Sequence, residues 1–157
     1  MLKQKKGFTL IELLIVIGII SILAAIIFVA VDPARRLAEA RNADRWSSVN
    51  SILNAYLKYT VDNKGTEPVA LTASTYYMIG AGSDSSGCVA VTTTDHTNLA
   101  TNLVDTYLSS IPKDPKNATS GDKTYYYITK TASGRITVGA CTPETVGGET
   151  PVISVSR

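Results

Sequence analysis

The sequence contains few of the side chains that catalysis, metal binding or cofactor binding requires. It has one histidine, His96, and two cysteines, Cys88 and Cys141. It has no glycine-rich phosphate-binding loop and no Cys/His set with metal-ligand spacing. A catalytic triad would have to use His96, which lies beside Asp95 in a threonine-rich loop and is expected to be solvated. We therefore expect no catalytic residue, no cofactor and no metal, and a protein that is not an enzyme.

The sequence also has little net charge. It carries 15 Lys and Arg against 13 Asp and Glu, a formal charge of +2. Three lysines lie in the first seven residues, which leaves 12 basic side chains (15 less 3) against 13 acidic ones, or −1. No block of basic residues with interleaved aromatics occurs outside residues 1–7. No specific nucleic-acid partner is therefore expected.

The dominant feature that is present is an apolar run near the N-terminus. Phe8–Val31 is 24 residues long and contains one ionisable side chain, Glu12. As a helix rising ~1.5 Å per residue it would extend about 36 Å, enough to cross a hydrocarbon core of ~30 Å. The preceding Met1–Gly7 has three lysines and no acid. The positive-inside rule then keeps the N-terminus in the cytoplasm and directs the rest of the chain outward.

Two residues distinguish this run from an ordinary signal anchor. A carboxylate such as Glu12 costs roughly 2.5–3.5 kcal/mol at the centre of a membrane helix and by default marks a functional group. The small Gly7 comes directly before the run, where a peptidase at the cytoplasmic face can reach it, whereas an ordinary secretory signal is cut after its apolar run. The segment resembles the leader of bacterial type IV pilins and pseudopilins in the residues Gly7-Phe8-Thr9-Leu10-Ile11-Glu12, followed by Leu13-Leu14-Ile15-Val16-Ile17.

The resemblance implies a processing and assembly pathway. A membrane-embedded prepilin peptidase would cut after Gly7 and methylate the new N-terminus at Phe8. The mature subunit would wait as a single-pass protein in the cytoplasmic membrane and then enter a helical homo-oligomeric filament through its apolar helix. Glu12 matches the family's invariant glutamate, which is expected to meet the amine of Phe8 in a neighbouring subunit. The implied partners are the peptidase, a pilus assembly platform and minor pilins, and the final location is an extracellular pilus.

The residues after the apolar run predict a second, amphipathic helical segment. Asp32-Pro33 allows two interpretations: Asp32 caps a new helix that begins with Pro33, or Pro33 kinks one long helix. The resemblance favours the near-continuous helix. Asn63-Lys64-Gly65 is expected to end it. The segment has a stripe of apolar residues at helical spacing and a set of charged residues expected on the surface. The stripe is Leu37, Ala40, Trp46, Val49, Ile52, Leu53, Tyr56, Leu57 and Val61, and the charged set is Arg35, Arg36, Glu39, Arg41, Asp44 and Arg45.

The last third of the chain predicts a small antiparallel sheet. Tyr125–Thr129 and Arg135–Cys141 flank a turn and indicate a hairpin, Val152–Val155 suits a final strand, and Cys88–Val91 is a weaker candidate. Asn98–Ser110 has the spacing of a short helix that ends before Ile111-Pro112-Lys113-Asp114-Pro115. The expected fold is α+β, with a long N-terminal helix packed on the sheet. The expected parts are a leader at 1–7, a membrane and filament-core helix at 8–31, and a pilin-like head with the rest of the helix at 32–157.

Two further predictions concern the exported part. Because an exported chain meets an oxidising environment, Cys88 and Cys141 are expected to form a disulfide rather than remain as two buried thiols. Some pseudopilins hold calcium near the positions of Asp114 and Asp122, but no EF-hand-like series of acids is present, so no metal site is predicted here.

Three functions compete. The first is a structural subunit of a type IV pilus used in adhesion, motility or DNA uptake. The second is a pseudopilin of a type II secretion or competence machine, which the resemblance of Ile111–Pro115 to major pseudopilins favours. The third is a signal-anchored enzyme or receptor, and the leader residues and the lack of a catalytic set argue against it.

Overall fold

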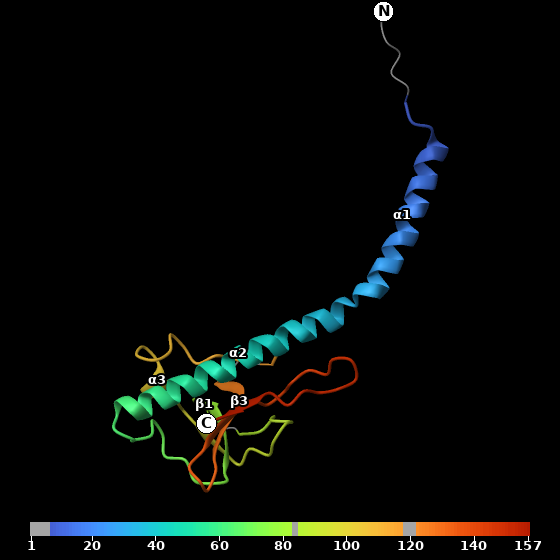
Figure 1. The fold of residues 1–157 in the computed structure, drawn as a ribbon. Coiled ribbons are helices and arrows are strands. Elements are labelled where there is room, and N and C mark those ends of the chain that lie inside the picture. The colour runs from blue at the N-terminus through green and yellow to red at the C-terminus, as the bar shows by residue number, and fades with distance from the viewer. Residues whose placement is uncertain (1–6, 83–84, 118–121) are drawn as a thin grey trace, which may run out of the picture. The chain divides into compact units, whose positions relative to one another are not determined.

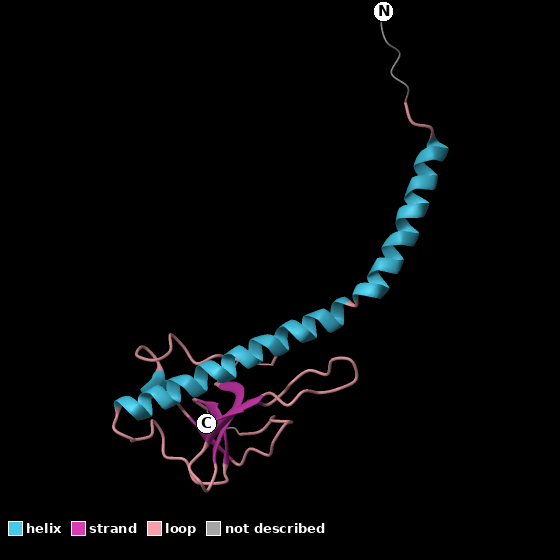
Figure 2. Cartoon of the chain, in the orientation of Figure 1, coloured by secondary structure: helices cyan, strands magenta, loops and turns pink. Residues whose placement is uncertain are grey.

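The computed structural model describes residues 7–82, 85–117 and 122–157 of the chain (Figures 1 and 2). It has two compact units, one ending at Leu37 and the other formed by Ala38–Arg157. The first unit is helical, and the second contains a helix, a five-stranded sheet and their connections.

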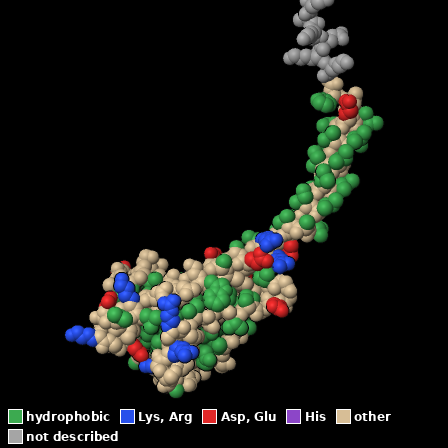
Figure 3. Space-filling view, viewed as in Figure 1, with side chains coloured by type: hydrophobic (Ala, Val, Ile, Leu, Met, Phe, Trp, Pro, Cys, Tyr) green, Lys and Arg blue, Asp and Glu red, His purple; other side chains and the backbone are tan. Residues whose placement is uncertain are grey.

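The first unit is built on α1, Leu10–Val31. Thr9 caps its N-terminus, and none of its residues is buried. The space-filling view shows hydrophobic side chains along its whole length (Figure 3). Among the described residues, Leu10–Asp62 is the one helical stretch that contains a window long and apolar enough to cross a membrane, and it lies near the N-terminus.

The helical hydrogen-bond pattern is interrupted at Asp32, between α1 and α2, Pro33–Asp62. Asp32 has φ = 42°, in the left-handed region, because the ring of a following proline disfavours the right-handed helical conformation. Its carboxylate accepts a hydrogen bond from the backbone N–H of Arg35 at 3.3 Å, and its carbonyl accepts one from Arg36 at 3.2 Å. Asp32 thus caps a new helix that begins with Pro33, which is the first of the two interpretations. The near-continuous helix that the resemblance favoured is interrupted at this one residue.

In the second unit, α2 packs against one face of the sheet (Figure 1). The central part of the predicted stripe is buried, but its two ends are not: Leu37 is 58% exposed and Val61 is 77% exposed. Trp46 is also exposed. The helix ends as predicted, with Gly65 at φ = 92° and its N–H donating to the carbonyl of Thr60 at 2.8 Å. The buried residues of α2 are Ala38, Asn42, Arg45, Val49, Ile52, Leu53, Ala55 and Tyr56.

The sheet has the strand order β2-β1-β3-β4-β5, and all neighbouring pairs are antiparallel except β1 and β2. The predicted hairpin is confirmed as β3 and β4, in which Tyr127 lies opposite Gly139. A short final strand is present as β5, and the α+β class is confirmed. The strands are β1 Tyr76–Gly80, β2 Asp95–Thr97, β3 Lys123–Lys130, β4 Ile136–Ala140 and β5 Ser154–Ser156.

Three local features differ from the predictions. Strand β1 was not predicted. Cys88–Val91 is irregular backbone rather than a strand, so that prediction was wrong, and the short strand β2 follows it at Asp95–Thr97. The helix expected at Asn98–Ser110 is reduced to α3, Ala100–Leu103, because Val104 already has the extended dihedrals φ = −73° and ψ = 150°.

Candidate processing and assembly site

The bond between Gly7 and Phe8 lies in exposed, non-helical backbone two residues before the first residue of α1. The Phe8 side chain is 93% exposed. A Cβ added to Gly7 would meet no atom within 4 Å. Packing therefore gives no reason for a glycine here. The prediction that explains Gly7 is that the peptidase requires a small residue at its cleavage site.

Glu12 and Thr9 form a capping box at the start of α1. The Oε2 atom of Glu12 accepts hydrogen bonds from the Thr9 N–H and the Thr9 hydroxyl, both at 2.8 Å. The Thr9 Oγ1 in turn accepts one from the Glu12 N–H at 3.3 Å. The positive end of the helix dipole adds to this arrangement. The carboxylate of Glu12 is thus partly compensated within its own chain. Both bonds that it accepts from Thr9 end on Oε2, so the capping box does not use Oε1.

Comparison with known families agrees with this local structure. Residues 2–28 match the family model described as the prokaryotic N-terminal methylation motif. The match includes Gly7, Phe8 and Glu12. The chain therefore carries the leader that defines the class of type IV pilins and pseudopilins, which confirms the resemblance on which the prediction was based.

The leader motif together with the apolar N-terminal helix fits a membrane-anchored pilin or pseudopilin before assembly. The motif points to a structural subunit that is processed by prepilin peptidase, rather than to an enzyme. Comparisons of the whole chain with curated proteins and with solved structures give no match.

The predicted disulfide between Cys88 and Cys141 is confirmed. Cys141 is buried beyond the end of β4, and its N–H donates to the carbonyl of Tyr125 at 2.9 Å. Its carbonyl accepts hydrogen bonds from the N–H groups of Val89 and Ala90, each at 3.0 Å. The bridge and these bonds fix the irregular segment between β1 and β2 to the sheet.

Replacing both Cys88 and Cys141 with Ser should lower the free energy of unfolding of the head by about 4 kcal/mol. The bridge closes a loop with a sequence separation of 53 residues, and the chain-entropy estimate for such a loop gives this magnitude. Chemical denaturation of the oxidised chain and of the double variant, followed by Trp46 fluorescence, measures the difference. Replacing both cysteines together leaves no unpaired thiol, and equal stabilities would contradict the estimate.

A buried ionic cluster in the head was not predicted from the sequence. Arg45 was assigned to the charged surface of α2, but its side chain is 0% exposed. Its Nε and Nη2 donate to the two carboxylate oxygens of Asp114 at 2.7 and 3.1 Å. Its Nη1 donates to Asn42 at 2.9 Å and to Glu144 at 3.1 Å. The signal was present in the sequence, because Asn42 and Arg45 continue the helical spacing of Val49 and the buried residues after it.

The carboxylates of this cluster are held ionised. Burial by itself would raise the pKa of Asp114, but hydrogen bonds from Arg45 and from the backbone N–H groups of Asn117 and Lys116 lower it below its ordinary value. Hydrogen bonds from Arg41 lead the causes that lower the pKa of Glu144 to about 2. Asp114 therefore binds a guanidinium, and we assign it no calcium.

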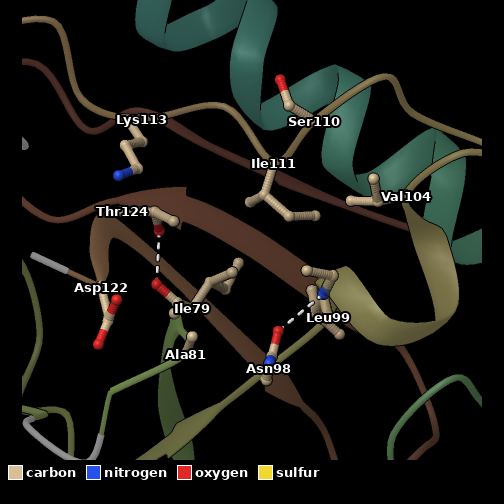
Figure 4. Close-up of a pocket in the computed structure, with 12 residues that line it drawn as sticks. Ile79, Ala81, Asn98, Leu99, Val104, Ser110, Ile111, Lys113, Asp122 and Thr124 are labelled. Carbon is tan, nitrogen blue, oxygen red and sulfur yellow. Dashed lines mark hydrogen bonds between the residues drawn. The ribbon is translucent and has the colours of Figure 1, made fainter.

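A separate cavity of about 310 Å³ lies between β1, α3 and the start of β3 (Figure 4). Its lining contains Lys113 and Asp122 but no histidine or cysteine. His96 lies on β2 with its Nδ1 atom 3.5 Å from Asp95, in a side chain that is 38% exposed. Within the described ranges, no three His, Cys, Asp or Glu side chains are grouped so that they could hold a metal ion.

Proposed function

We propose that the chain is a structural subunit of a type IV pilus-like filament, cleaved after Gly7, N-methylated on Phe8 and assembled through α1. The observation that carries the proposal is a leader motif followed by a helix whose apolar side chains have no cover in the folded chain. Every Phe, Leu, Ile and Val side chain from Phe8 to Val31 is at least 48% exposed. A surface of this kind requires lipid or other subunits around it.

The energies support storage in the membrane before assembly. Burying one such side chain contributes about 1.5–3 kcal/mol, so the helix as a whole gains tens of kcal/mol in lipid. The insertion cost of Glu12 is roughly 2.5–3.5 kcal/mol at mid-depth and less near the interface. The helix is therefore stable in the membrane despite Glu12. The carboxylate keeps its insertion cost there until a cation pairs with it.

Cleavage would create that partner. Hydrolysis after Gly7 frees the amine of Phe8, which keeps a proton at neutral pH with an unperturbed pKa near 7.7–8.0 and remains a base after a single methylation. Glu12 of one subunit and the Phe8 amine of the next then form an ion pair as water is excluded. The pair fixes the axial register of neighbouring helices, and the assembly platform, minor pilins and peptidase are the expected partners. The finished filament lies on the cell surface.

The second candidate is a pseudopilin of a type II secretion or competence machine. The segment Ile111–Pro115 favours it through its similarity to major pseudopilins, and in the structure this segment supplies Asp114 to the buried cluster. Both candidates use the same leader and the same helix. They differ in whether the filament is found on the cell surface or within the envelope.

The test is the intact mass and N-terminal sequence of the protein from its native cells, in sheared surface filaments and in membrane fractions. We expect a mature chain that begins at methylated Phe8 and is recovered in the sheared fraction. A Gly7→Leu variant should remain full-length in the membrane, while the matched Gly7→Ala variant, which keeps a small residue, should still be cut. Normal cleavage of Gly7→Leu would contradict the proposal, and mature protein confined to the envelope would favour the pseudopilin.

A further inference from the structure

The face of the sheet opposite α2 carries a pair of tyrosines surrounded by hydroxyl groups. Tyr76 on β1 and Tyr127 on β3 lie edge to face, with ring centroids 5.7 Å apart and an interplanar angle of 65°. Tyr127 covers Gly139 on β4, where an added Cβ would lie 2.4 Å from the ring. Tyr127 is buried, whereas Tyr76 is partly exposed. Of these two rings, Tyr76 is therefore the accessible one.

Tyr76 lines two hollows at once. One has a volume of about 450 Å³, and four of its six lining residues are Ser or Thr. The other has a volume of about 360 Å³, and five of its nine lining residues are Ser or Thr. Both hollows are open to solvent. Because Tyr76 and Ser74 line both, the two hollows are adjacent, and we call them together the Tyr76 trough.

The Tyr76 trough offers hydrogen bonds but almost no charge. Lys130 is the one charged residue in either lining, and its ammonium is paired with the carboxylate of Glu67. A hydroxyl group both donates and accepts hydrogen bonds. The lining hydroxyls include those of Ser74, Thr75, Thr92, Thr94 and Thr129.

The chemistry of the lining indicates three properties of a ligand that would fit it. The ligand carries many hydroxyl groups, because each lining hydroxyl can both donate and accept a hydrogen bond. It has no net charge, because neither hollow holds an unpaired ionic group. It has a flat apolar face that can lie against an aromatic ring, since tyrosine combines an apolar ring with a polar tip. A neutral sugar chain meets all three conditions, with its ring C–H groups on one face and its hydroxyls at the edge.

We propose that the Tyr76 trough binds a neutral polysaccharide, with one sugar on each side of Tyr76. The site belongs to the head and is independent of α1. Binding can therefore be measured on the unassembled subunit, and its failure would leave the filament proposal untouched. Ser74 has φ = 63°, a conformation that is uncommon for residues other than glycine and that places this residue between the two hollows.

The experiment uses the full mature chain in lipid nanodiscs, because sugar-headed detergents would compete for the site. Cellohexaose and chitohexaose are the neutral probes, and an oligomer of polyuronic acid of similar length is the charged one. Saturation-transfer NMR reports contact, and titration gives the Kd. We expect saturation of the two neutral oligomers and at least tenfold weaker binding of the polyuronic acid.

Three variants define the site. Tyr76→Ala should weaken binding at least tenfold, whereas Tyr76→Phe, which keeps the ring, should retain most of it. Thr94→Glu places a charge in an exposed position of one hollow and should also weaken binding at least tenfold. Thr101→Glu is the matched control, because Thr101 is exposed on α3 and lines neither hollow. Near-UV circular dichroism checks that each variant is folded.

Several outcomes would overturn the proposal. These are no saturation of either neutral oligomer, equal affinity of the parent chain and Thr94→Glu, and a preference for the polyuronic acid. The heads could instead self-associate in a way that Thr94→Glu abolishes and the oligomers do not affect. That result would assign the Tyr76 trough to a second copy of this chain.

Discussion

In cells that produce the Glu12→Gln variant, we expect the precursor to enter the membrane and to be cut after Gly7, while the yield of sheared filaments falls at least tenfold. Glutamine is nearly the same size as glutamate and keeps a carbonyl oxygen that can accept the Thr9 N–H and hydroxyl bonds of the capping box. The change therefore removes the charge and leaves the local helix start in place. Quantitative immunoblots of sheared and membrane fractions measure the result.

The energies indicate what the pair contributes to assembly. An ion pair between Glu12 and the Phe8 amine of a neighbour, at ~4 Å and an effective dielectric constant near 20, contributes about 4 kcal/mol of Coulomb energy. This is comparable with the roughly 2.5–3.5 kcal/mol cost of placing the carboxylate in the membrane. The pair thus offsets the penalty and adds little net stability. We infer that its main product is the register between subunits, which the neutral glutamine cannot specify.

Two control variants separate charge from helix capping. Glu12→Asp keeps the charge on a shorter side chain and should recover part of the filament yield. Thr9→Val removes the hydroxyl that binds Glu12 but keeps the backbone N–H, so it should reduce the yield less than Glu12→Gln. Filaments at the parental yield from Glu12→Gln would contradict the proposed pair. Accumulation of uncut precursor would show that Glu12 acts in recognition by the peptidase.

Sequence patterns were sufficient for features that depend on local chemistry. The apolar run, its lysine-rich start and the residues around Gly7 predicted a membrane helix and a leader, and the motif match agrees. The Pro33 ring and the capping side chain of Asp32 act on their immediate neighbours, so one of the two interpretations of that dipeptide already described the break. The hairpin of β3 and β4 was found because its strands are adjacent in sequence and joined by a short turn that contains Gly134.

Features that depend on distant partners were missed. β1 pairs with β2 in parallel and with β3 across a long connection, and nothing local in its five residues specifies either pairing. Cys88–Val91 was interpreted as a strand from its apolar residues, but the disulfide and the carbonyl of Cys141 hold it as a loop. The charge of Arg45 suggested a surface position, and partners far along the chain, Asp114 69 residues later and Glu144 99 residues later, make its burial possible.

The Arg45→Met variant should lose about 3–5 kcal/mol of head stability, the magnitude expected when one partner of a buried ion pair is removed. Methionine replaces the apolar stem of Arg45 but leaves the 0% exposed carboxylate of Asp114 without its cation. Arg41→Met is the matched control on the same helix. Its side chain is 30% exposed, and Glu144 keeps Arg45 and Lys116, so a loss nearer ~1 kcal/mol is expected there. Chemical denaturation followed by Trp46 fluorescence measures both.

Acid separates the charge of Arg45 from its packing. In the parent chain the folded-state pKa values of Asp114 and Glu144 are lowered, so their stabilising effect is complete above the unfolded values and is lost as the pH falls from about 4.5 towards 2. Without Arg45, Asp114 loses the largest of the contributions that lower its pKa, so acid costs the variant less stability than it costs the parent. The deficit of Arg45→Met relative to the parent should therefore be largest near pH 7 and shrink below pH 4.5, and Asp114→Asn added to Arg45→Met should recover much of it at pH 7. A deficit that stays constant with pH, and that Asp114→Asn does not reduce, would mean that Arg45 stabilises the head through its apolar stem rather than through its charge.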